Sequence, residues 1–406
     1  MRAYYLDTSL RNDVGHHGNF CRRIVGAFRA RGIETLAFGH REVEEALRSE
    51  LGVAPHFRVT AYNRFDPDPI AGWLNDFLRV ARWTREDLNR LPPPRRSDIV
   101  LATSIRPAQL LALVEWQQDL APDSRPAVVA ESTGTGLAVT VTADGMSAKA
   151  PNPHTDPRAT LYRFIGRKLP REAEGRFHFA TFGRIPSELF HAILQFPVRT
   201  LPLPFSSDKP PRARAGARSP LVAVLGHQRA AKGYDLLPEI VEELLRLSRD
   251  FRLLLQVVAP VGLPEVRPRL AEIARRSGRV ILEEEPAGRE RWPQLMEMTD
   301  LALCPYRSDA YQVGISAVAA EAIPQGIPLV VPAATTIETL VRESGAGAAV
   351  FDRFEPAAIA AATSEALDRF DELARLSYAA ALRWPETQGP ARLVEELLAL
   401  CEAGAA

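Results

Sequence analysis

Short apolar runs alternate with longer amphipathic stretches along the first half of the chain. Apolar runs of about four to eight residues are typical of buried strands, and the stretches between them have the apolar spacing of helices. The pattern predicts strands at Ala3–Asp7, Ile33–Gly39, Phe57–Tyr62, Ile99–Ser104, Ala127–Ser132, Phe177–Phe182 and Val198–Leu203. It predicts helices over Asn19–Arg31, Glu42–Leu51, Ile70–Asn89, Pro107–Asp119, Pro157–Lys168 and Pro186–Leu194. This βαβα order indicates a doubly wound parallel sheet.

The same alternation begins again after a proline-rich segment. Pro204, Pro210 and Pro211, followed by the small and basic stretch ARAGARS, predict a linker over residues 205–220. Beyond it the pattern predicts strands at Leu221–Leu225, Phe251–Val258, Val280–Leu282, Leu301–Tyr306, Ile327–Val331 and Ala348–Phe351. It predicts further helices over Tyr234–Arg249, Pro356–Arg369, Asp371–Arg383 and Pro390–Glu402. The sequence therefore predicts two α/β domains, over residues 1–204 and 221–385, and a final helical segment over residues 386–406.

Composition and charge narrow the kind of partner. The 406 residues are 46% hydrophobic and 25% charged, which is typical of a globular protein. Fifty basic and fifty acidic side chains cancel, so nothing in the charge favours nucleic acid as a partner. The three cysteines, Cys21, Cys304 and Cys401, are too scattered for a disulfide framework or a metal motif. They favour a reducing compartment.

The N-terminus carries no targeting pattern. The stretch MRAYYLDTSL reaches Asp7 without a long apolar core, and no apolar run in the chain approaches 18 residues. We therefore expect a cytoplasmic protein. Peripheral contact with the inner face of a membrane and the oligomeric state both stay open.

The stretch YRSDAYQVGISAVAAEAIPQGIPLVVP, residues 306–332, is the first candidate binding segment. A polar loop leads from one strand into a small-residue helix predicted over Ser316–Gln325, whose N-terminus lies at the carboxyl edge of the sheet. Backbone N–H groups there suit an anion, so Gly314, Ile315 and Ser316 are predicted to hold a phosphate or a sugar. Glu321 lies in an otherwise apolar run, where a carboxylate needs a partner. A glutamate on the solvated face of the helix is the alternative.

The loop GHQRAAKG, residues 226–233, is the second candidate. Gly226 ends a strand and permits close approach of a ligand. Arg229 and Lys232 precede a helix, and two fixed cations suit a diphosphate. The loop does not match the Walker pattern, and a solvated basic turn is the alternative. Because both segments follow strands of one parallel sheet, the cations would meet the phosphates while Glu321 accepts two hydroxyls of a ribose.

The first half contains two weaker candidates. The stretch DVGHHGN places His16 and His17 in a predicted loop after the first strand, and the glycines around them lack the dinucleotide spacing. Glu131 begins the glycine-rich strand end ESTGTG. His16, His17 and Glu131 are therefore the candidates for catalysis, with plain strand–helix turns as the alternative. Residues 137–157 are poor in large apolar side chains and are predicted to form a mobile loop, a candidate acceptor-binding segment.

The second half resembles the donor-binding domain of family 4-type glycosyltransferases with the GT-B architecture. The resemblance rests on GHQRAAKG(Y)DLL and on DLALCPY…VGISAVAAEAIPQGIPLVVP…ETLVRESGAG; it is good over residues 221–365 and weak over the first domain. It implies two Rossmann-like domains facing a cleft, a C-terminal helix that crosses back to the first domain, and a nucleotide-sugar donor. Arg229 and Lys232 match the pyrophosphate-binding pair, and Glu321 matches the second glutamate of the Glu-x7-Glu pattern, which holds the ribose.

One position departs from that pattern. The first glutamate of the pair would fall at Val313, which has no carboxylate to contact the transferred sugar. Either the backbone of residues 314–316 or the side chain of Arg307, Tyr311 or Gln312 takes that task, or the donor differs, or activity is lost. The family's first-domain histidine also has no clear match.

The resemblance implies sugar transfer from a UDP-, GDP- or dTDP-sugar to a glycan, lipid or protein acceptor, with retention of configuration and a role in polysaccharide biosynthesis. No strand ends in a DxD-like pair, because Asp66 and Asp68 lie in a DPDP loop, so no metal and no cofactor is expected. A catalytically silent GT-B protein that partners a related enzyme is the main alternative, and a sugar-nucleotide epimerase is a third. The sequence argues against a nicotinamide dehydrogenase, since no GxGxxG follows a strand with an acidic residue about 20 positions on.

Overall fold

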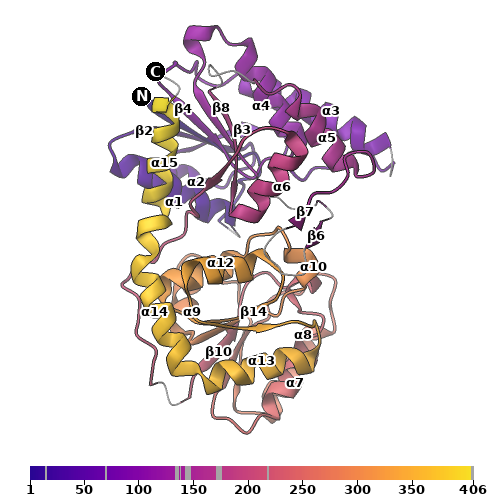
Figure 1. Ribbon diagram of the computed structural model, residues 1–406, viewed down its shortest axis with the longest axis vertical. Helices are drawn as coiled ribbons and strands as arrows, with labels where there is room; N and C mark the ends of the chain where they lie inside the picture. The colour runs from indigo at the N-terminus through magenta and orange to yellow at the C-terminus, as the bar shows by residue number, and fades with distance from the viewer. Residues whose placement is uncertain are drawn as a thin grey trace. The chain divides into compact units, whose positions relative to one another are not determined.

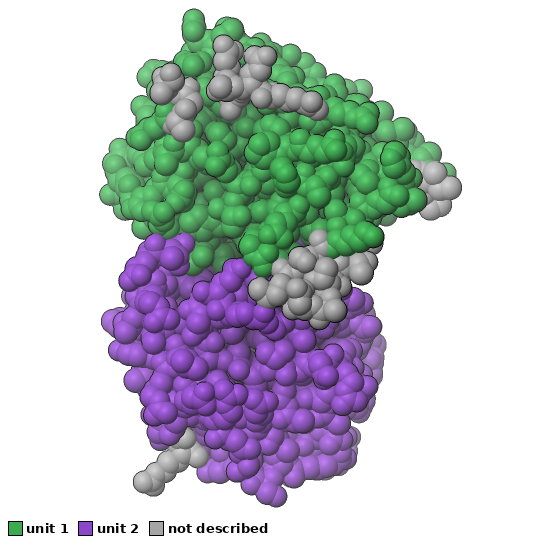
Figure 2. Space-filling model, viewed as in Figure 1, with its two compact units in different colours: residues 1–140, 148–204, 388–406 green, residues 141–147, 205–387 purple. Residues whose placement is uncertain are grey.

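The computed structural model describes residues 1–13, 16–68, 71–132, 137, 139–141, 148–170, 176–216 and 219–403. The chain divides into two compact units, each built on one parallel sheet (Figure 2). Unit 1 comprises residues 1–140, 148–204 and 388–406, and unit 2 comprises residues 141–147 and 205–387. Two parallel α/β sheets in one chain are the architecture that the sequence predicts.

Unit 1 contains a seven-stranded parallel sheet with the order β3-β2-β1-β4-β5-β8-β9 (Figure 1). Its strands are β1 (Arg2–Leu6), β2 (Glu34–His40), β3 (Val53–Phe57), β4 (Ile99–Ala102), β5 (Ala127–Glu131), β8 (Phe177–Phe182) and β9 (Val198–Leu201). Every residue of β4 and β5 is buried, as expected for central parallel strands covered on both faces. The segment between β5 and β8 also contains two strands of two residues each, β6 (Thr140–Val141) and β7 (Ala148–Lys149), which form a separate two-stranded sheet.

Seven helices of unit 1 are described, and together with its sheet they enclose the core. They are α1 (His16–Ala30), α2 (Glu45–Leu51), α3 (Ala71–Leu88), α4 (Pro107–Asp119), α5 (Pro157–Gly166), α6 (Arg184–Leu194) and the C-terminal α15 (Pro390–Ala403). Helix α4 is buried on almost all sides, and its Leu110, Val114 and Trp116 belong to the core cluster. Helix α15 packs on α1, and Gly389 N just before it donates to Leu203 O at 2.8 Å.

Unit 2 contains a six-stranded parallel sheet with the order β12-β11-β10-β13-β14-β15 (Figure 1). Its strands are β10 (Leu221–Val224), β11 (Arg252–Gln256), β12 (Val280–Glu283), β13 (Leu301–Leu303), β14 (Leu329–Pro332) and β15 (Ala348–Phe351). Its described helices are α7 (Leu237–Leu245), α8 (Val266–Arg276), α9 (Arg291–Met298), α10 (Ser308–Tyr311), α11 (Ala317–Ala322), α12 (Thr336–Ser344), α13 (Pro356–Asp368) and α14 (Phe370–Thr387).

Each sheet reverses its strand order at one place. In unit 1 the chain winds outward from β1 through β2 and β3, then returns to the other side of β1 with β4. In unit 2 the same reversal lies between β10 and β13. Loops that leave the two central strands in opposite directions open a crevice at the carboxyl edge, where open α/β sheets bind their ligands. The loops after β1, β4, β10 and β13 are therefore the places to look for a site.

Two predicted elements of unit 1 were wrong in their bounds. The strand expected at Phe57–Tyr62 ends at Phe57, because Thr60 N donates to Asn63 Oδ1 at 2.6 Å and turns the chain. The first helix begins at His16 and not at Asn19, and Arg22 within it donates to both carboxylate oxygens of Asp13. In unit 2 the helix expected over Tyr234–Arg249 is shorter, and Pro238 lies in its first turn.

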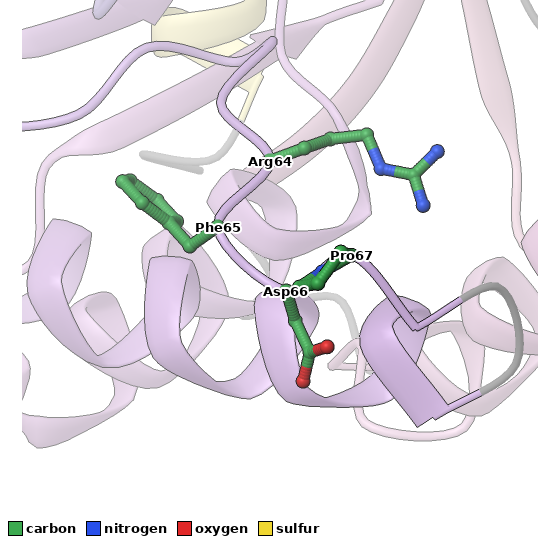
Figure 3. Close-up of a pocket in the computed structure, with 4 residues that line it drawn as sticks. All are labelled: Arg64, Phe65, Asp66 and Pro67. Carbon is green, nitrogen blue, oxygen red and sulfur yellow. The ribbon is translucent and has the colours of Figure 1, made fainter.

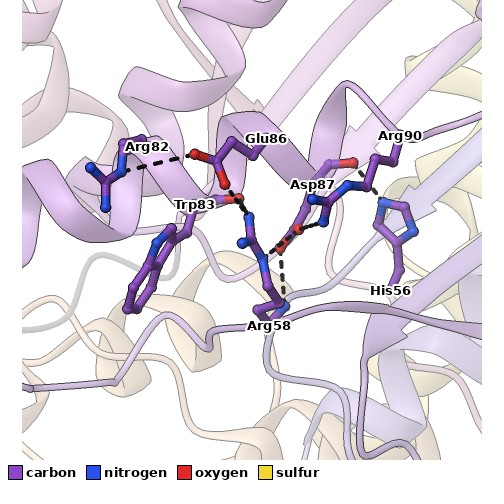
Figure 4. A network of polar contacts seen from close by, with 7 residues as sticks. All are labelled: His56, Arg58, Arg82, Trp83, Glu86, Asp87 and Arg90. Carbon is purple, nitrogen blue, oxygen red and sulfur yellow. Dashed lines mark hydrogen bonds and ion pairs between the residues drawn. The ribbon is translucent and has the colours of Figure 1, made fainter.

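A polar network ties the end of β3 to the end of α3 (Figure 4). Asp87, only 1% exposed, accepts from Arg58 N at 3.0 Å, Arg58 Nε at 2.8 Å and Arg90 Nη1 at 3.1 Å. The Asp87 carbonyl oxygen lies 2.8 Å from His56 Nε2. Glu86 Oε2 accepts a hydrogen bond from Arg58 Nη2 at 2.8 Å. This network holds the strand end against the helix.

None of the described helices has the length and hydropathy that a membrane crossing needs.

Candidate functional site

The loop after β10 approaches its neighbours closely at Gly226. Its φ of 103° is unfavourable for other residues. A Cβ there would also lie 2.9 Å from Lys232 Nζ and 3.0 Å from Val318 Cγ2 of α11. Glycine thus permits the lysine ammonium to lie over the strand end, next to the helix that carries Glu321.

Two buried glutamines hold this loop in place. Gln256 Oε1, at the end of β11, accepts from Gly226 N at 2.7 Å. Gln228 Oε1 accepts from Val258 N at 3.0 Å and Ala259 N at 2.9 Å, and its Nε2 donates to Gly226 O at 3.0 Å. The backbone of residues 226–228 is therefore preorganised. Neither glutamine has a local sequence pattern that indicates this role, because their partners Gly226 and Ala259 lie 30 and 31 positions away along the chain.

Lys232 is the last residue of a short 3-10 turn over residues 230–232, and Arg229 is the N-cap of that turn. Lys232 Nζ lies 5.0 Å from the centre of the Tyr306 ring. Burial lowers the pKa of Lys232 to about 8, and the charge of Arg229 acts in the same direction. Arg229 is exposed, with Nη2 3.1 Å from His227 Nδ1. A solvated basic turn would leave both cations in water, so the half-buried lysine favours the ligand-binding interpretation.

The loops after β10 and β13 touch one another. Arg307 N donates to Ala231 O at 3.1 Å. Beside this bond, a Cβ on Gly233 would lie 1.9 Å from Pro305 O, and Gly233 has a φ of 75°. The two candidate segments of the sequence therefore form one continuous edge at the strand-order reversal of unit 2.

The backbone of residues 314–316 is held from both sides. Ser316 is the N-cap of α11, and its hydroxyl accepts from Ala319 N at 3.2 Å. Thr336 Oγ1, from the start of α12, donates to Gly314 O and also lies 3.1 Å from Tyr311 O. Ile315 is half-buried between them. The helix predicted over Ser316–Gln325 is split into α11 and a 3-10 turn over Ile323–Gln325, because Pro324 interrupts it.

Glu321 does not lie on a solvated face. Its side chain is 6% exposed, and Oε2 accepts a hydrogen bond from Trp292 Nε1 at 2.7 Å. A buried carboxylate with an N–H donor beside it can accept further hydroxyl groups. Trp292, at the start of α9, is a site residue that the sequence did not indicate, since it lies 29 positions away.

Val313 is buried, with 6% exposure, among the apolar residues of this edge. The three side chains considered in its place have other contacts. Arg307 lies 3.5 Å from the Asp235 carboxylate and packs over Phe354, and the Tyr311 ring lies 4.6 Å from that of Tyr306. Gln312 is half-buried. Val313 therefore supplies no carboxylate, and Arg307 and Tyr311 are in contact with other side chains.

In unit 1, His17 belongs to the first turn of α1 and not to a loop, which corrects the prediction for the GHHG stretch. Its Nδ1 lies 2.7 Å from Asp7 Oδ2, directly after β1. Burial alone would lower the pKa of His17, but the charge and hydrogen bond of Asp7 outweigh burial and raise it. His16 begins the same helix, and its side chain lies outside the described residues, as do Gly15, Gly134 and Gly136.

Glu131 lies at the end of β5 and is fully buried. Its Oε2 accepts from Ser104 N at 2.8 Å, and Ser104 adopts a φ of 55° after β4. Its Oε1 has no hydrogen-bond partner among the described residues. Burial, with the charge of Asp7 adding to it, raises the pKa of Glu131 to about 8. Asp7, His17 and Glu131 thus gather at the strand-order reversal of unit 1.

A cavity of about 560 Å³ lies elsewhere in unit 1, lined by Arg64, Phe65, Asp66 and Pro67 (Figure 3). In the close-up, the Arg64 and Phe65 side chains extend in opposite directions from the loop between β3 and α3. The four lining residues differ from all the candidate site residues. Within the described part of the chain, no three His, Cys, Asp or Glu side chains form a metal-binding group.

The two doubly wound parallel sheets define the GT-B fold, and solved structures agree. A glycosyltransferase from Rickettsia africae aligns with a TM-score of 0.66 at 11% identity, covering 100% of this chain and 99% of the other. The HepE protein of Anabaena in complex with UDP aligns at 0.62 and 14% identity, covering 98% and 100%. An E. coli trehalose-6-phosphate structure bound with UDP-2-fluoro glucose aligns at 0.65 and 13%, covering 100% and 99%. The expected fold is confirmed.

The family is shown by its sequence model. The model of the family 4 glycosyltransferases in conflict systems matches residues 158–398, more than half of the chain. The chain belongs to this family of glycosyltransferases, which confirms the resemblance seen in the sequence. No curated protein matches it.

Proposed function

We propose that this chain transfers a sugar from a nucleoside-diphosphate donor, and that the loops after β10 and β13 hold the donor. The observation that carries the proposal is the junction of these loops, where Lys232 lies against Gly226 and Tyr306 while Val318 of the Glu321 helix lies beside them. Cations on the loop after β10 and a buried carboxylate on the helix beside that loop suit a diphosphate and a ribose.

Lys232 and Arg229 would hold the diphosphate. The leaving nucleoside diphosphate gains negative charge as the glycosidic bond breaks, and fixed cations next to it lower the barrier. Lys232 already has a lowered pKa, so a bound diphosphate would restore its full charge and gain a strong contact. Because these two cations can stabilise the negative charge of the leaving diphosphate, we propose that transfer needs no metal ion.

Glu321 would accept hydrogen bonds from the hydroxyls of the donor ribose. The N–H groups of Gly314, Ile315 and Ser316 would meet the distal phosphate or the transferred sugar. The HepE structures contain UDP, UDP with glucose, and UDP-glucose, which makes a UDP-sugar the first donor to test ahead of GDP- and dTDP-sugars.

Unit 1 would bind the acceptor, a glycan, lipid or protein. The His17–Asp7 pair would take a proton from an acceptor hydroxyl, and the Glu131 carboxyl would donate or accept a hydrogen bond; the His17–Asp7 contact and the bond from Ser104 N to Glu131 support this. Retention of configuration follows from the family only.

A second candidate is a catalytically silent GT-B protein that partners a related transferase. Val313 favours it, because a buried apolar side chain stands where the family pattern has a carboxylate.

The test is transfer of radiolabelled sugar from UDP-glucose, UDP-GlcNAc, GDP-mannose and dTDP-rhamnose into a bacterial extract, with EDTA present. We expect one donor to label an acceptor and Lys232→Gln to abolish the labelling. Labelling that needs an added metal would contradict metal independence. Absence of labelling from every donor, in a protein that still binds nucleotide, would favour the silent partner.

A further inference from the structure

Trp292 contacts the Glu321 carboxylate directly. Its indole Nε1 donates to Glu321 Oε2 at 2.7 Å, a short bond for an N–H donor. Glu321 is 6% exposed, whereas the Trp292 side chain is half-buried and reaches the surface of unit 2. The hydrogen bond therefore joins the buried carboxylate to a partly exposed side chain at the start of α9.

The start of α9 holds Trp292 firmly. Trp292 N donates to Gly288 O at 3.0 Å. The neighbouring Arg291 Nε donates to Glu283 Oε2 at 3.0 Å, which ties the helix to the end of β12. One turn further, Leu295 and Met296 are fully buried. The indole therefore stays fixed relative to the sheet edge.

Such a contact selects one orientation of the carboxylate. An indole N–H can only donate, so it pairs with a carboxylate oxygen and offers no competing acceptor to a ligand hydroxyl. A charged acceptor strengthens the bond, and burial raises the cost of leaving the carboxylate without it. Each carboxylate oxygen has more than one lone-pair direction, so an oxygen that accepts from an indole N–H can also accept from a hydroxyl.

We propose that Trp292 is a positioning residue that orients Glu321 toward the 2′- and 3′-hydroxyls of the donor ribose, and so makes the site selective for ribonucleotides. The inference rests on the proposed donor site and narrows its substrate class. It favours UDP-, GDP- or ADP-sugars as donors and disfavours a dTDP-sugar.

The test is calorimetric binding of three ribo- and deoxyribonucleotide pairs, UDP and dUDP, GDP and dGDP, and ADP and dADP. We expect the wild type to bind one ribonucleotide at least tenfold more tightly than its deoxy partner. Trp292→Phe removes the N–H but keeps an aromatic ring, and should weaken the ribonucleotide about tenfold and the deoxyribonucleotide, which keeps only the 3′-hydroxyl, by less. The ratio of the two dissociation constants then falls toward one.

Trp384→Phe is the matched control. It removes an indole hydrogen bond of similar length, 2.8 Å to Phe205 O, from helix α14 of the same unit. This variant should keep the wild-type ratio even where it lowers the melting temperature. An unchanged ratio in Trp292→Phe, with tight ribonucleotide binding in the wild type, would overturn the positioning role alone. No ribonucleotide binding by the folded wild type would overturn the proposed donor site and this inference together.

Discussion

Gly233 and Pro305 lie so close that a single added carbon on Gly233 would stand 1.9 Å from the Pro305 carbonyl oxygen. Gly233 ends the loop after β10, and Pro305 begins the loop after β13. Their contact holds the two halves of the proposed donor site at a fixed separation. Since the obstructing atom belongs to the backbone, it cannot move aside as the end of a flexible side chain would.

We expect Gly233→Ala to destabilise the protein by about 3 kcal/mol, because strain at its φ of 75° adds to the displacement of the Pro305 strand end. Nucleotide affinity should fall as well. Urea unfolding and calorimetry measure the two effects.

Gly262→Ala provides the control for backbone strain alone. Gly262 has a φ of 71°, and a Cβ there would have no atom within 4 Å. This variant should cost about 1 kcal/mol and leave nucleotide affinity unchanged. Equal losses of stability in the two variants would show that the contact with Pro305 contributes nothing.

The lowered pKa of Lys232 predicts a pH dependence of nucleotide binding. The ammonium is charged below a pKa of about 8 and neutral above it, so at higher pH Lys232 must take up a proton when a diphosphate binds. We expect UDP affinity to be nearly level below pH 7 and to fall about tenfold between pH 7 and 9. Lys232→Gln should bind more weakly at pH 7 and lack this fall. A wild-type profile as flat as that of the variant would place the lysine away from the phosphates.

The raised pKa of Glu131 predicts a pH dependence of stability. The unfolded carboxyl loses its proton near a pKa of 4.5, whereas the folded one keeps it to a pKa of about 8. The folded state therefore binds the extra proton between these values, and stability falls as pH rises through that window. We expect wild type to lose about 4 kcal/mol more than Glu131→Gln between pH 5 and pH 9. Equal losses in urea unfolding would contradict a buried, protonated Glu131.

The network at the end of β3 predicts a large effect at one carboxylate and a small one at its neighbour (Figure 4). Asp87→Ala should destabilise unit 1 by about 3 kcal/mol, because it leaves Arg58 and Arg90 without their buried partner. Glu86→Ala removes the exposed partner of the same Arg58 and should change stability little. Thermal unfolding of both variants compares them directly, and a similar melting temperature for the two would refute the structural role of Asp87.

Much of the fold could be predicted because parallel strands buried on both faces leave a strong apolar signal. The runs at Ile99 and at Ala127 show this. The strand expected over Phe57–Tyr62 ends at Phe57 because Arg58 binds Asp87, 29 residues away, and Thr60 begins a turn at Asn63. The loop expected at His16 failed for a related reason, since His17 is paired with Asp7 and Arg22 with Asp13.

The candidate site could be predicted where motif and local chemistry coincide, as at Lys232 and Glu321. The residues that hold those groups in place could not, because Gln228, Gln256 and Trp292 act across distant segments of the chain. A glutamine or tryptophan has no local pattern that indicates its partner. Only the folded sheet brings Trp292 to Glu321.

Calorimetric binding of UDP, GDP, dTDP and ADP, with NAD as the control, tests the central claim most directly. The claim is that the loops after β10 and β13 hold a nucleoside diphosphate through Lys232 and Glu321. We expect the wild type to bind one nucleoside diphosphate selectively, and this binding to weaken at least tenfold in Lys232→Gln and in Glu321→Ala. Absence of binding to all of them, or binding that both variants retain, would contradict it.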